Sequence, residues 1–223
     1  CGTIVEYNSR KEIVWTWNSC DYIKMGDPTT HFNSFYFDEQ NKVFYTSYRN
    51  ISRVVKAAYP SGKVLALYGE DEKQDGSIKG HGMFYAQHNV GTNSDGNMHL
   101  FNNNFIMSSR GREGNDSRIS SVAIFREPRT PADSLQKIWE FSCDIDTFTK
   151  AISSGGGSVC ELDKGDYLVC MGLPGRNFIV SKDKKIIWNI ITKNKDEHGV
   201  WVPFAGYRIS PVNTKGLDKL LFR

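Results

Sequence analysis

The sequence predicts an all-β protein made of four-stranded antiparallel sheets that repeat around one axis, an architecture known as a β-propeller. The main observation is a motif in which a lysine-bearing turn precedes a short strand rich in aromatic and aliphatic residues. It recurs four times, roughly 50 to 75 residues apart, at 11–17, 62–68, 136–141 and 184–189. Each copy follows another short strand in which apolar and polar residues alternate. Recurrence of one supersecondary unit over this distance is typical of propeller blades.

Strand and turn patterns assign the blades in order along the chain. In the first whole blade, 31–38 and 42–50 alternate between apolar and polar residues around a polar turn, and two more strands end at Tyr68. In the second blade, Asp95-Gly96 is a strong hairpin pattern between two such strands. We predict half blades at 1–18 and 204–223 and whole blades at 31–69, 87–142 and 156–191.

This set of blades predicts an incomplete ring. We expect six blades in the complete protein and interpret the chain as its C-terminal part, a single propeller domain. The alternative is that the head and tail strands pair into one composite blade, which gives about four blades, the lower end of the range that propellers use. The remaining blades, or a second copy of the chain, are then candidate partners.

Composition excludes several classes of function. The chain has 223 residues, 39% of them hydrophobic, which is enough for a sizeable core. Its 28 basic and 25 acidic residues give a net charge of only +3, too balanced to predict binding to nucleic acid or to an anionic membrane surface. No stretch approaches the ~20 apolar residues that span a bilayer. We predict no cofactor and no metal site.

The five cysteines are not spaced as metal ligands, and their odd number does not give a closed disulfide framework. Cys160 and Cys170 flank one hairpin; buried packing is the default interpretation for them, and a disulfide is the alternative. Cys1 is interpreted either as the lipid-modified cysteine of a surface lipoprotein or as the point where a fragment begins, and we favour the fragment.

Equivalent positions of the blades predict a site on the propeller axis. Residues that lie eight positions before a hairpin glycine are His88, Gly157 and Arg208, and His31 holds the same place in the first blade to within one residue. In a propeller these strand starts line one mouth of the central channel. Two imidazoles and a guanidinium there suit a sulfate, phosphate or carboxylate, with room left by the glycine. The alternative is that each residue only caps its strand.

Further side chains are candidates to bind an anion at this mouth. Arg49 ends the second strand of its blade, and Asn103 holds a similar place in the next one. Arg110 and Arg112 lie on a long insertion from which an arginine could reach over the mouth, and Arg118 opens a third strand. Solvated loops and local pairing are the alternative interpretations.

The ordered set of motifs resembles the arylsulfotransferase (aryl-sulfate sulfotransferase) family of exported six-bladed propellers, over most of 3–212. The segments that carry the resemblance are His31-Phe32-Asn33-Ser34, Ser47-Tyr48-Arg49-Asn50, Gln87-His88-Asn89, Asp95-Gly96-Asn97 and Ser117-Arg118-Ile119. The resemblance implies sulfuryl transfer from a phenolic sulfate ester to another phenol, with no nucleotide donor and no cofactor. It also implies export to the periplasm, the cell surface or the medium.

In that chemistry one histidine is transiently sulfated while other His and Arg side chains hold the sulfuryl oxygens. By position, His31 and His88 correspond to two channel histidines and are the expected catalytic residues. Arg112 or Arg118 corresponds to the sulfate-binding arginine, and Arg49, Arg208 and Asn103 are expected to line the substrate site.

The sequence departs from the family pattern at the nucleophile. The family's nucleophilic histidine lies in a later blade, but this chain has no histidine between His99 and His198. His81, His99 and His198 are expected in loops or on strand surfaces. The alternative function is therefore a non-catalytic exported propeller that binds an anion or acts as a scaffold. A glycan-cleaving propeller is disfavoured, because no carboxylate pair stands at aligned positions.

Overall fold

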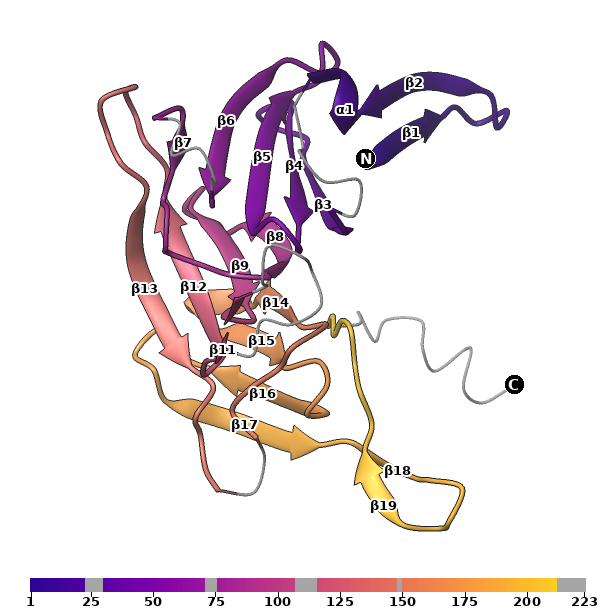
Figure 1. The fold of residues 1–223 in the computed structure, drawn as a ribbon, viewed down its shortest axis with the longest axis vertical. Coiled ribbons are helices and arrows are strands. Elements are labelled where there is room, and N and C mark those ends of the chain that lie inside the picture. Colours follow the sequence, from indigo (N-terminus) through magenta and orange to yellow (C-terminus); the bar gives the residue numbers. More distant parts are fainter. Residues whose placement is uncertain (23–29, 71–75, 107–115, 148–149, 212–223) are drawn as a thin grey trace.

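Three four-stranded antiparallel sheets follow one another along the chain in a computed structural model that describes residues 1–22, 30–70, 76–106, 116–147 and 150–211 (Figure 1). The first blade consists of β3 (Phe32–Asp38), β4 (Val43–Tyr48), β5 (Arg53–Ala58) and β6 (Val64–Gly69), with β7 (Ile78–Lys79) added parallel to β6. The second consists of β8 (His88–Thr92), β9 (Met98–Asn102), β12 (Ser121–Arg126) and β13 (Gln136–Ser142). The third consists of β14 (Ser158–Glu161), β15 (Tyr167–Cys170), β16 (Arg176–Val180) and β17 (Ile186–Ile191).

Smaller elements flank the blades. An N-terminal hairpin of β1 (Thr3–Tyr7) and β2 (Ile13–Asn18) leads into the short helix α1 (Ser19–Tyr22). Two further hairpins are formed by β10 (Phe105–Ile106) with β11 (Asp116–Ser117), and by β18 (Lys193–Lys195) with β19 (Trp201–Pro203). Within the described residues, no helix is long and apolar enough to cross a membrane.

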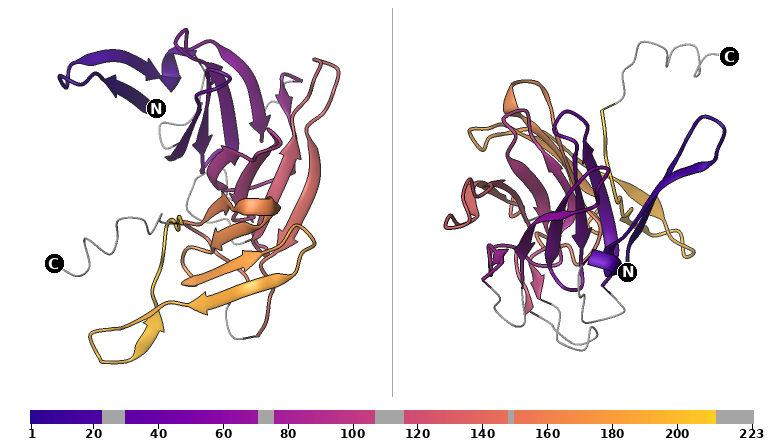
Figure 2. Two further views of the ribbon diagram at one scale, coloured as in Figure 1. Left: turned by 180° about the vertical axis from the view of Figure 1, so that it is seen from behind. Right: turned by 90° about the horizontal axis from the view of Figure 1, so that it is seen from above.

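The blades fan around a common centre, and their first strands, β3, β8 and β14, lie on the inner side (Figures 1 and 2). Side chains join these inner strands: Asn33 Nδ2 donates to the Gln87 carbonyl at 2.7 Å, and Asn89 Oδ1 accepts from the Val159 amide at 2.6 Å. The chain is thus an all-β propeller with four-stranded antiparallel blades, as the sequence predicts.

The hydrophobic core lies between blades rather than within one sheet. One buried cluster packs Tyr45, Val54 and Tyr68 of the first blade against Leu100 and Phe125 of the second. A second cluster joins the second blade to the third, and a third joins the N-terminal hairpin to the first blade. Burial of apolar faces between adjacent sheets is what holds a propeller's blades in sequence.

A partly buried carboxylate also links the first two blades. Glu127, just after β12, accepts hydrogen bonds from the Tyr45 and Tyr68 hydroxyls at 3.0 and 2.8 Å and from Lys56 Nζ at 2.7 Å. Burial and the neighbouring carboxylate raise the pKa of both tyrosines far above the usual range.

The C-terminal region differs from the expected half blade. The segment between the third blade and the expected half blade contains the hairpin of β18 and β19, and 205–211 forms no strand. Instead of entering a ladder, the Ile209 amide donates to Ser158 Oγ at 3.0 Å and the Gly206 amide to the Gly172 carbonyl at 3.2 Å. The rest of the expected half blade, from Val212, lies outside the described residues.

The cysteines also differ from expectation. Cys1 forms a disulfide with Cys20, so its sulfur is not available to carry a lipid. Cys160 and Cys170 are free thiols, because Cys160 pairs with Leu168 in the ladder and Cys170 with Ser158. The disulfide alternative for this pair is therefore wrong. Cys170 is buried, as expected for a packing residue, and so is Cys143, whereas Cys160 is only partly buried.

The expectation that His99 lies on a strand surface is wrong. Its side chain is only 6% exposed, between the second and third blades, and Gly91 packs closely enough that a Cβ there would approach His99 Nε2 at 2.8 Å. Burial lowers the pKa of His99 from its ordinary value of 6.5 to about 4.

We predict that His99 makes the fold sensitive to mild acid. Unfolded His99 takes up a proton near pH 6.5 and folded His99 only near pH 4, so stability should fall as the pH drops from 6.5. The loss between pH 7 and pH 5 should be about 2 kcal/mol. Urea unfolding at both pH values measures it. His99→Gln should lose the part of this pH dependence that His99 contributes and keep the part due to His31 and His88, whose pKa values burial also lowers, whereas the exposed His81→Gln should keep all of it. An unchanged dependence in His99→Gln contradicts the assignment.

Candidate functional site

Two histidines and an arginine meet at the start of the inner strands. His31 directly precedes β3, His88 opens β8, and the Arg49 amide, just after β4, donates to the His31 carbonyl at 3.0 Å. The His31 and His88 rings lie 6.5 Å apart between centroids, at 73°. We call this region, defined by His31, Arg49 and His88, the histidine end of the inner strands.

The strand pairing places both histidines at the start of an inner strand, opposite the end of the second strand. Phe32, directly after His31, pairs with Tyr48, and His88 pairs with Phe101. Both strands contain a register shift just after this point. The backbone of His31 is left-handed, with φ of 56°, a conformation that non-glycine residues adopt rarely and often at functional sites.

Arg49 extends from the first blade toward the loop that precedes the third. Its Nη2 donates to the Ser154 carbonyl at 2.7 Å, its Nη1 donates to Asn50 Oδ1 at 3.0 Å, and its guanidinium lies 5.9 Å from the centre of the Phe105 ring. The side chain is half-buried. Fixed contacts from two blades therefore hold one positive charge beside the two imidazoles.

Burial and Arg49 keep both histidines neutral. Burial lowers the pKa of His88, which is 8% exposed; the hydrogen bond from His88 to Asn103 Oδ1 opposes this, while the charges of Arg49 and His31 lower the pKa further. The pKa of His31, a more exposed residue, is lowered by partial burial and by Arg49. At neutral pH the site thus combines neutral imidazoles with a guanidinium, which suits an anionic ligand.

Asn103 lies behind His88. It is fully buried, its Oδ1 lies 2.8 Å from His88 Nδ1, and its Nδ2 donates to the Ser153 and Gly156 carbonyls at 2.8 and 2.9 Å. Its side chain is thus engaged by the protein itself.

The other expected arginines do not join the two histidines in the described part of the chain. Arg112, together with Arg110, lies outside the described residues. Arg118 is exposed, with its guanidinium 5.9 Å from the Tyr85 ring centre. Arg208 is exposed and lies near Cys160, where its charge partly offsets the effect of burial, which raises the pKa of that thiol.

One further expectation about this region is corrected, for Gly157, and one agrees with the structure, for His198. Gly157 leaves room for the Phe101 ring rather than for a ligand, because a Cβ at this position would overlap that ring. His198 lies on the hairpin between β18 and β19, and its side chain is 78% exposed beside Glu197. It does not fold toward the histidine end.

Sequence reasoning missed the residues that support the site. Gln87 is buried, and its Nε2 donates to Ser47 Oγ at 2.9 Å and to the Arg53 carbonyl at 3.1 Å, so it fixes the start of β8 against the first blade. Its position directly before His88 was the available indication. Ser154 and Phe105 belong to irregular connections and carry no comparable pattern.

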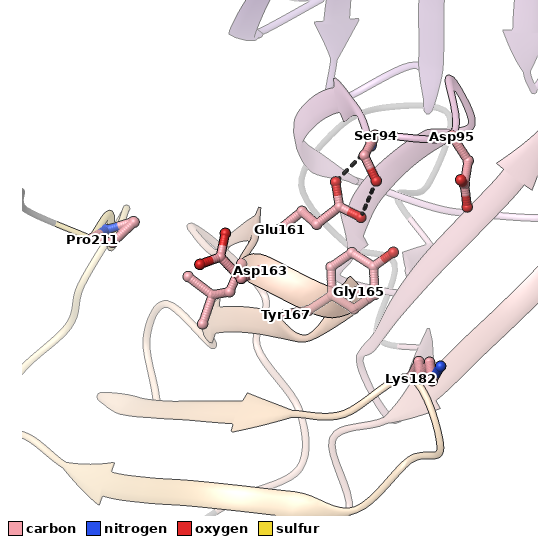
Figure 3. Close-up of a pocket in the computed structure, with 9 residues that line it drawn as sticks. Ser94, Asp95, Glu161, Asp163, Gly165, Tyr167, Lys182 and Pro211 are labelled. Atoms are coloured by element: carbon pink, nitrogen blue, oxygen red, sulfur yellow. Dashed lines mark hydrogen bonds between the residues drawn. The ribbon is translucent and has the colours of Figure 1, made fainter.

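A solvent-open hollow of about 990 Å³ lies at the other end of the inner strands (Figure 3). The hairpins that follow β8 and β14 border it, and Glu161 there accepts hydrogen bonds from the Ser94 amide at 2.6 Å and from Ser94 Oγ at 3.0 Å. With Asp95 and Asp163 also in its lining, the hollow is acidic and does not suit a sulfate. In the part of the chain that the structure describes, no group of three or more His, Cys, Asp or Glu side chains could hold a metal.

Fold and site together define a propeller with a cluster of histidine and arginine at one end of its inner strands. The family model for arylsulfotransferases matches residues 3–204. The chain therefore belongs to the arylsulfotransferase family. No curated protein matches its sequence significantly.

Solved structures show weaker likenesses. A streptogramin B lyase is 10% identical with a TM-score of 0.43, and the match covers 74% of this chain and 42% of that one. The RRP9 WD40 repeats are 10% identical with a TM-score of 0.44, covering 74% and 39%. A putative 6-phosphogluconolactonase from Bacteroides fragilis is 13% identical with a TM-score of 0.42, covering 79% and 38%. The chain thus spans about two fifths of each of these structures, and such likenesses carry no argument about function.

We predict that Arg49→Gln raises the pKa of both His31 and His88, because the substitution removes the positive charge that disfavours their protonation. Titration of the histidine ring protons by NMR measures the shift. Arg118→Gln is the matched control and should leave both values in place. If Arg49→Gln also leaves them unchanged, the guanidinium does not set the electrostatics of the site.

Proposed function

We propose that this chain transfers a sulfuryl group from an aryl sulfate to a phenolic acceptor at the histidine end. The observation that carries the proposal is the convergence of His31, His88 and Arg49 in a chain of the arylsulfotransferase family. A sulfuryl group needs a positive charge for its oxygens, a nucleophile for its sulfur and a proton carrier for the phenols. One residue of the cluster suits each task.

Arg49 is the electrostatic clamp of the proposed site. Its guanidinium carries a permanent charge, and its bonds to Ser154 and Asn50 fix it before substrate arrives, so little reorganisation is needed on binding. Phe105, under the guanidinium, adds an aromatic surface next to the sulfuryl position.

His88 is the proposed nucleophile because it is buried and neutral. A ring nitrogen of His88 attacks the sulfur, the bond from sulfur to the aryl oxygen breaks, and the phenolate leaves with that electron pair. In the second step the acceptor oxygen attacks the sulfur, the bond from nitrogen to sulfur breaks, and its electrons return to His88. The product is a new aryl sulfate.

His31 is the proposed proton carrier, since it is exposed where a phenol can reach it. It takes the proton of the acceptor phenol in the second step and gives that proton to the leaving phenolate of the next turnover. The bound sulfate ester supports the protonated form, because its negative charge raises the pKa of a neighbouring imidazole.

The second candidate function is anion binding without turnover. The exposed position of His198 favours it, because the described residues then offer no histidine from a later blade to act as the nucleophile. In this case Arg49 and the histidines would hold a sulfate ester that is not cleaved.

We also infer that the protein is exported. The disulfide between Cys1 and Cys20 supports this, because disulfides persist in oxidising compartments and are rare in the cytosol.

We predict release of 4-nitrophenol from 4-nitrophenyl sulfate that depends on an added phenol, with the sulfated acceptor detected by mass spectrometry. His88→Ala should abolish release, and Arg49→Ala should lower kcat about 10²- to 10³-fold. His31→Ala should lower it about 10²- to 10⁴-fold. His198→Ala is the matched control and should retain activity.

The same variants separate the two candidate functions. If 4-nitrophenyl sulfate binds in calorimetry, and binding needs Arg49 but no phenol appears, the chain is an anion binder. If the wild-type protein neither binds nor cleaves the ester, both proposals are wrong.

A further inference from the structure

We propose that Asn103 is a positioning residue that holds the proton of neutral His88 on Nδ1 and leaves the lone pair on Nε2. The assignment of the proton follows from contacts alone. Its kinetic consequence rests on the proposed function, in which a ring nitrogen of His88 attacks sulfur.

The orientation of the Asn103 amide is fixed by its neighbours. Its Nδ2 lies 2.8 and 2.9 Å from the Ser153 and Gly156 carbonyl oxygens. Carbonyl oxygens only accept hydrogen bonds, so this corner of the amide must be the NH₂ group, and both of its hydrogens are used. The corner that faces His88 is therefore the oxygen.

The two contacts of His88 Nδ1 are both acceptors. Asn103 Oδ1 lies at 2.8 Å and the Ala86 carbonyl at 3.2 Å. A neutral imidazole carries one N–H, and only a protonated Nδ1 can donate a hydrogen bond to these acceptors. Nε2 is then the nitrogen with the lone pair, and it makes no hydrogen bond to any described residue.

The same loop sets the position of the nucleophile and of the clamp. Asn103 bonds to the carbonyls of Ser153 and Gly156, and Arg49 bonds to that of Ser154, which lies between them. Asn103 is fully buried and bonds both to this loop and to His88, so the position of the loop fixes the position of the His88 ring. The loop of the third blade thus aligns His88 from the second blade with Arg49 from the first.

The proton assignment is tested by ¹⁵N NMR of the histidine side chains above the pKa of His88, because protonated and unprotonated ring nitrogens differ strongly in chemical shift. The wild-type protein should show His88 with a protonated Nδ1 and an unprotonated Nε2. Asn103→Asp keeps an acceptor and should keep this pattern. Asn103→Leu removes the nearer acceptor and leaves only the Ala86 carbonyl at 3.2 Å, so His88 should shift toward a mixture of both tautomers.

The matched control is Asn102→Leu. Asn102 is the neighbouring buried amide, and its Oδ1 accepts from the Tyr85 and Asn104 amides at 2.9 and 3.0 Å, away from His88. This variant should lose a similar amount of stability while His88 keeps its proton on Nδ1. A wild-type spectrum with the proton on Nε2 overturns the proposal, even if Asn103→Leu fails to fold.

The kinetic test uses the aryl sulfate assay. Asn103→Leu should lower kcat about 10- to 100-fold with little change in KM. The acid limb of its pH profile should move to lower pH, because the Asn103 hydrogen bond raises the pKa of His88 and its loss lowers that pKa. Asn103→Asp should recover part of kcat.

A loss of folded protein alone would leave the acid limb in place, so an unmoved limb in a folded Asn103→Leu contradicts the positioning role. If the wild-type protein has no activity, the proposed function fails and the NMR result still decides the proton assignment. If the wild-type protein is active with the proton on Nε2, the function stands and the role of Asn103 is wrong.

Discussion

The architecture depends on short polar side chains that join one inner strand to the next. Inner strands of neighbouring blades are not paired in a common ladder, so these bonds cross the gap between sheets. Asn33 bonds to the Gln87 carbonyl, Ser34 accepts from the Val90 amide, and Asn89 accepts from the Val159 amide. A buried amide or carbonyl left unsatisfied costs about 1–3 kcal/mol. The bonds therefore set the spacing that brings His31 and His88 together.

Much of the fold could be predicted from the sequence, because the repeating motif has a physical cause. The lysine-bearing turn and aromatic strand become the fourth strand of each blade, in β6, β13 and β17, and the second strand of the N-terminal hairpin, β2. The tail was less predictable, since a strand needs a partner and 205–211 bonds to loops of the third blade instead. Pairing of Cys1 with Cys20 depends on how the N-terminal hairpin turns into α1, which no spacing rule encodes.

The candidate site was predictable in part, for a similar reason. Strand starts recur with the blades, so a repeat alignment finds His31 and His88, and strand ends give Arg49. The contact partners Ser154 and Phe105 lie in irregular loops, whose paths depend on tertiary packing. His99 alternates like a surface residue, but in a propeller both faces of a blade pack against neighbours, so alternation does not report exposure.

The two ends of the inner strands carry opposite charge. Arg49 lies at the histidine end, and Asp95, Glu161 and Asp163 line the hollow at the other. A potential that changes sign along the inner strands draws an anion toward one end and repels it from the other. The effect is strongest at low ionic strength, where screening is weak.

The hydrogen bonds of Glu127 to Tyr45 and Tyr68 affect the ultraviolet absorbance of the protein in alkali. The phenols of Tyr45 and Tyr68 stay un-ionised in alkali that converts ordinary tyrosines to phenolate, since a second negative charge would have to form beside a carboxylate. These two of the ten tyrosines therefore give no phenolate absorbance in an ultraviolet titration for as long as the first two blades remain packed together. Their late absorbance would mark the moment when the blades separate.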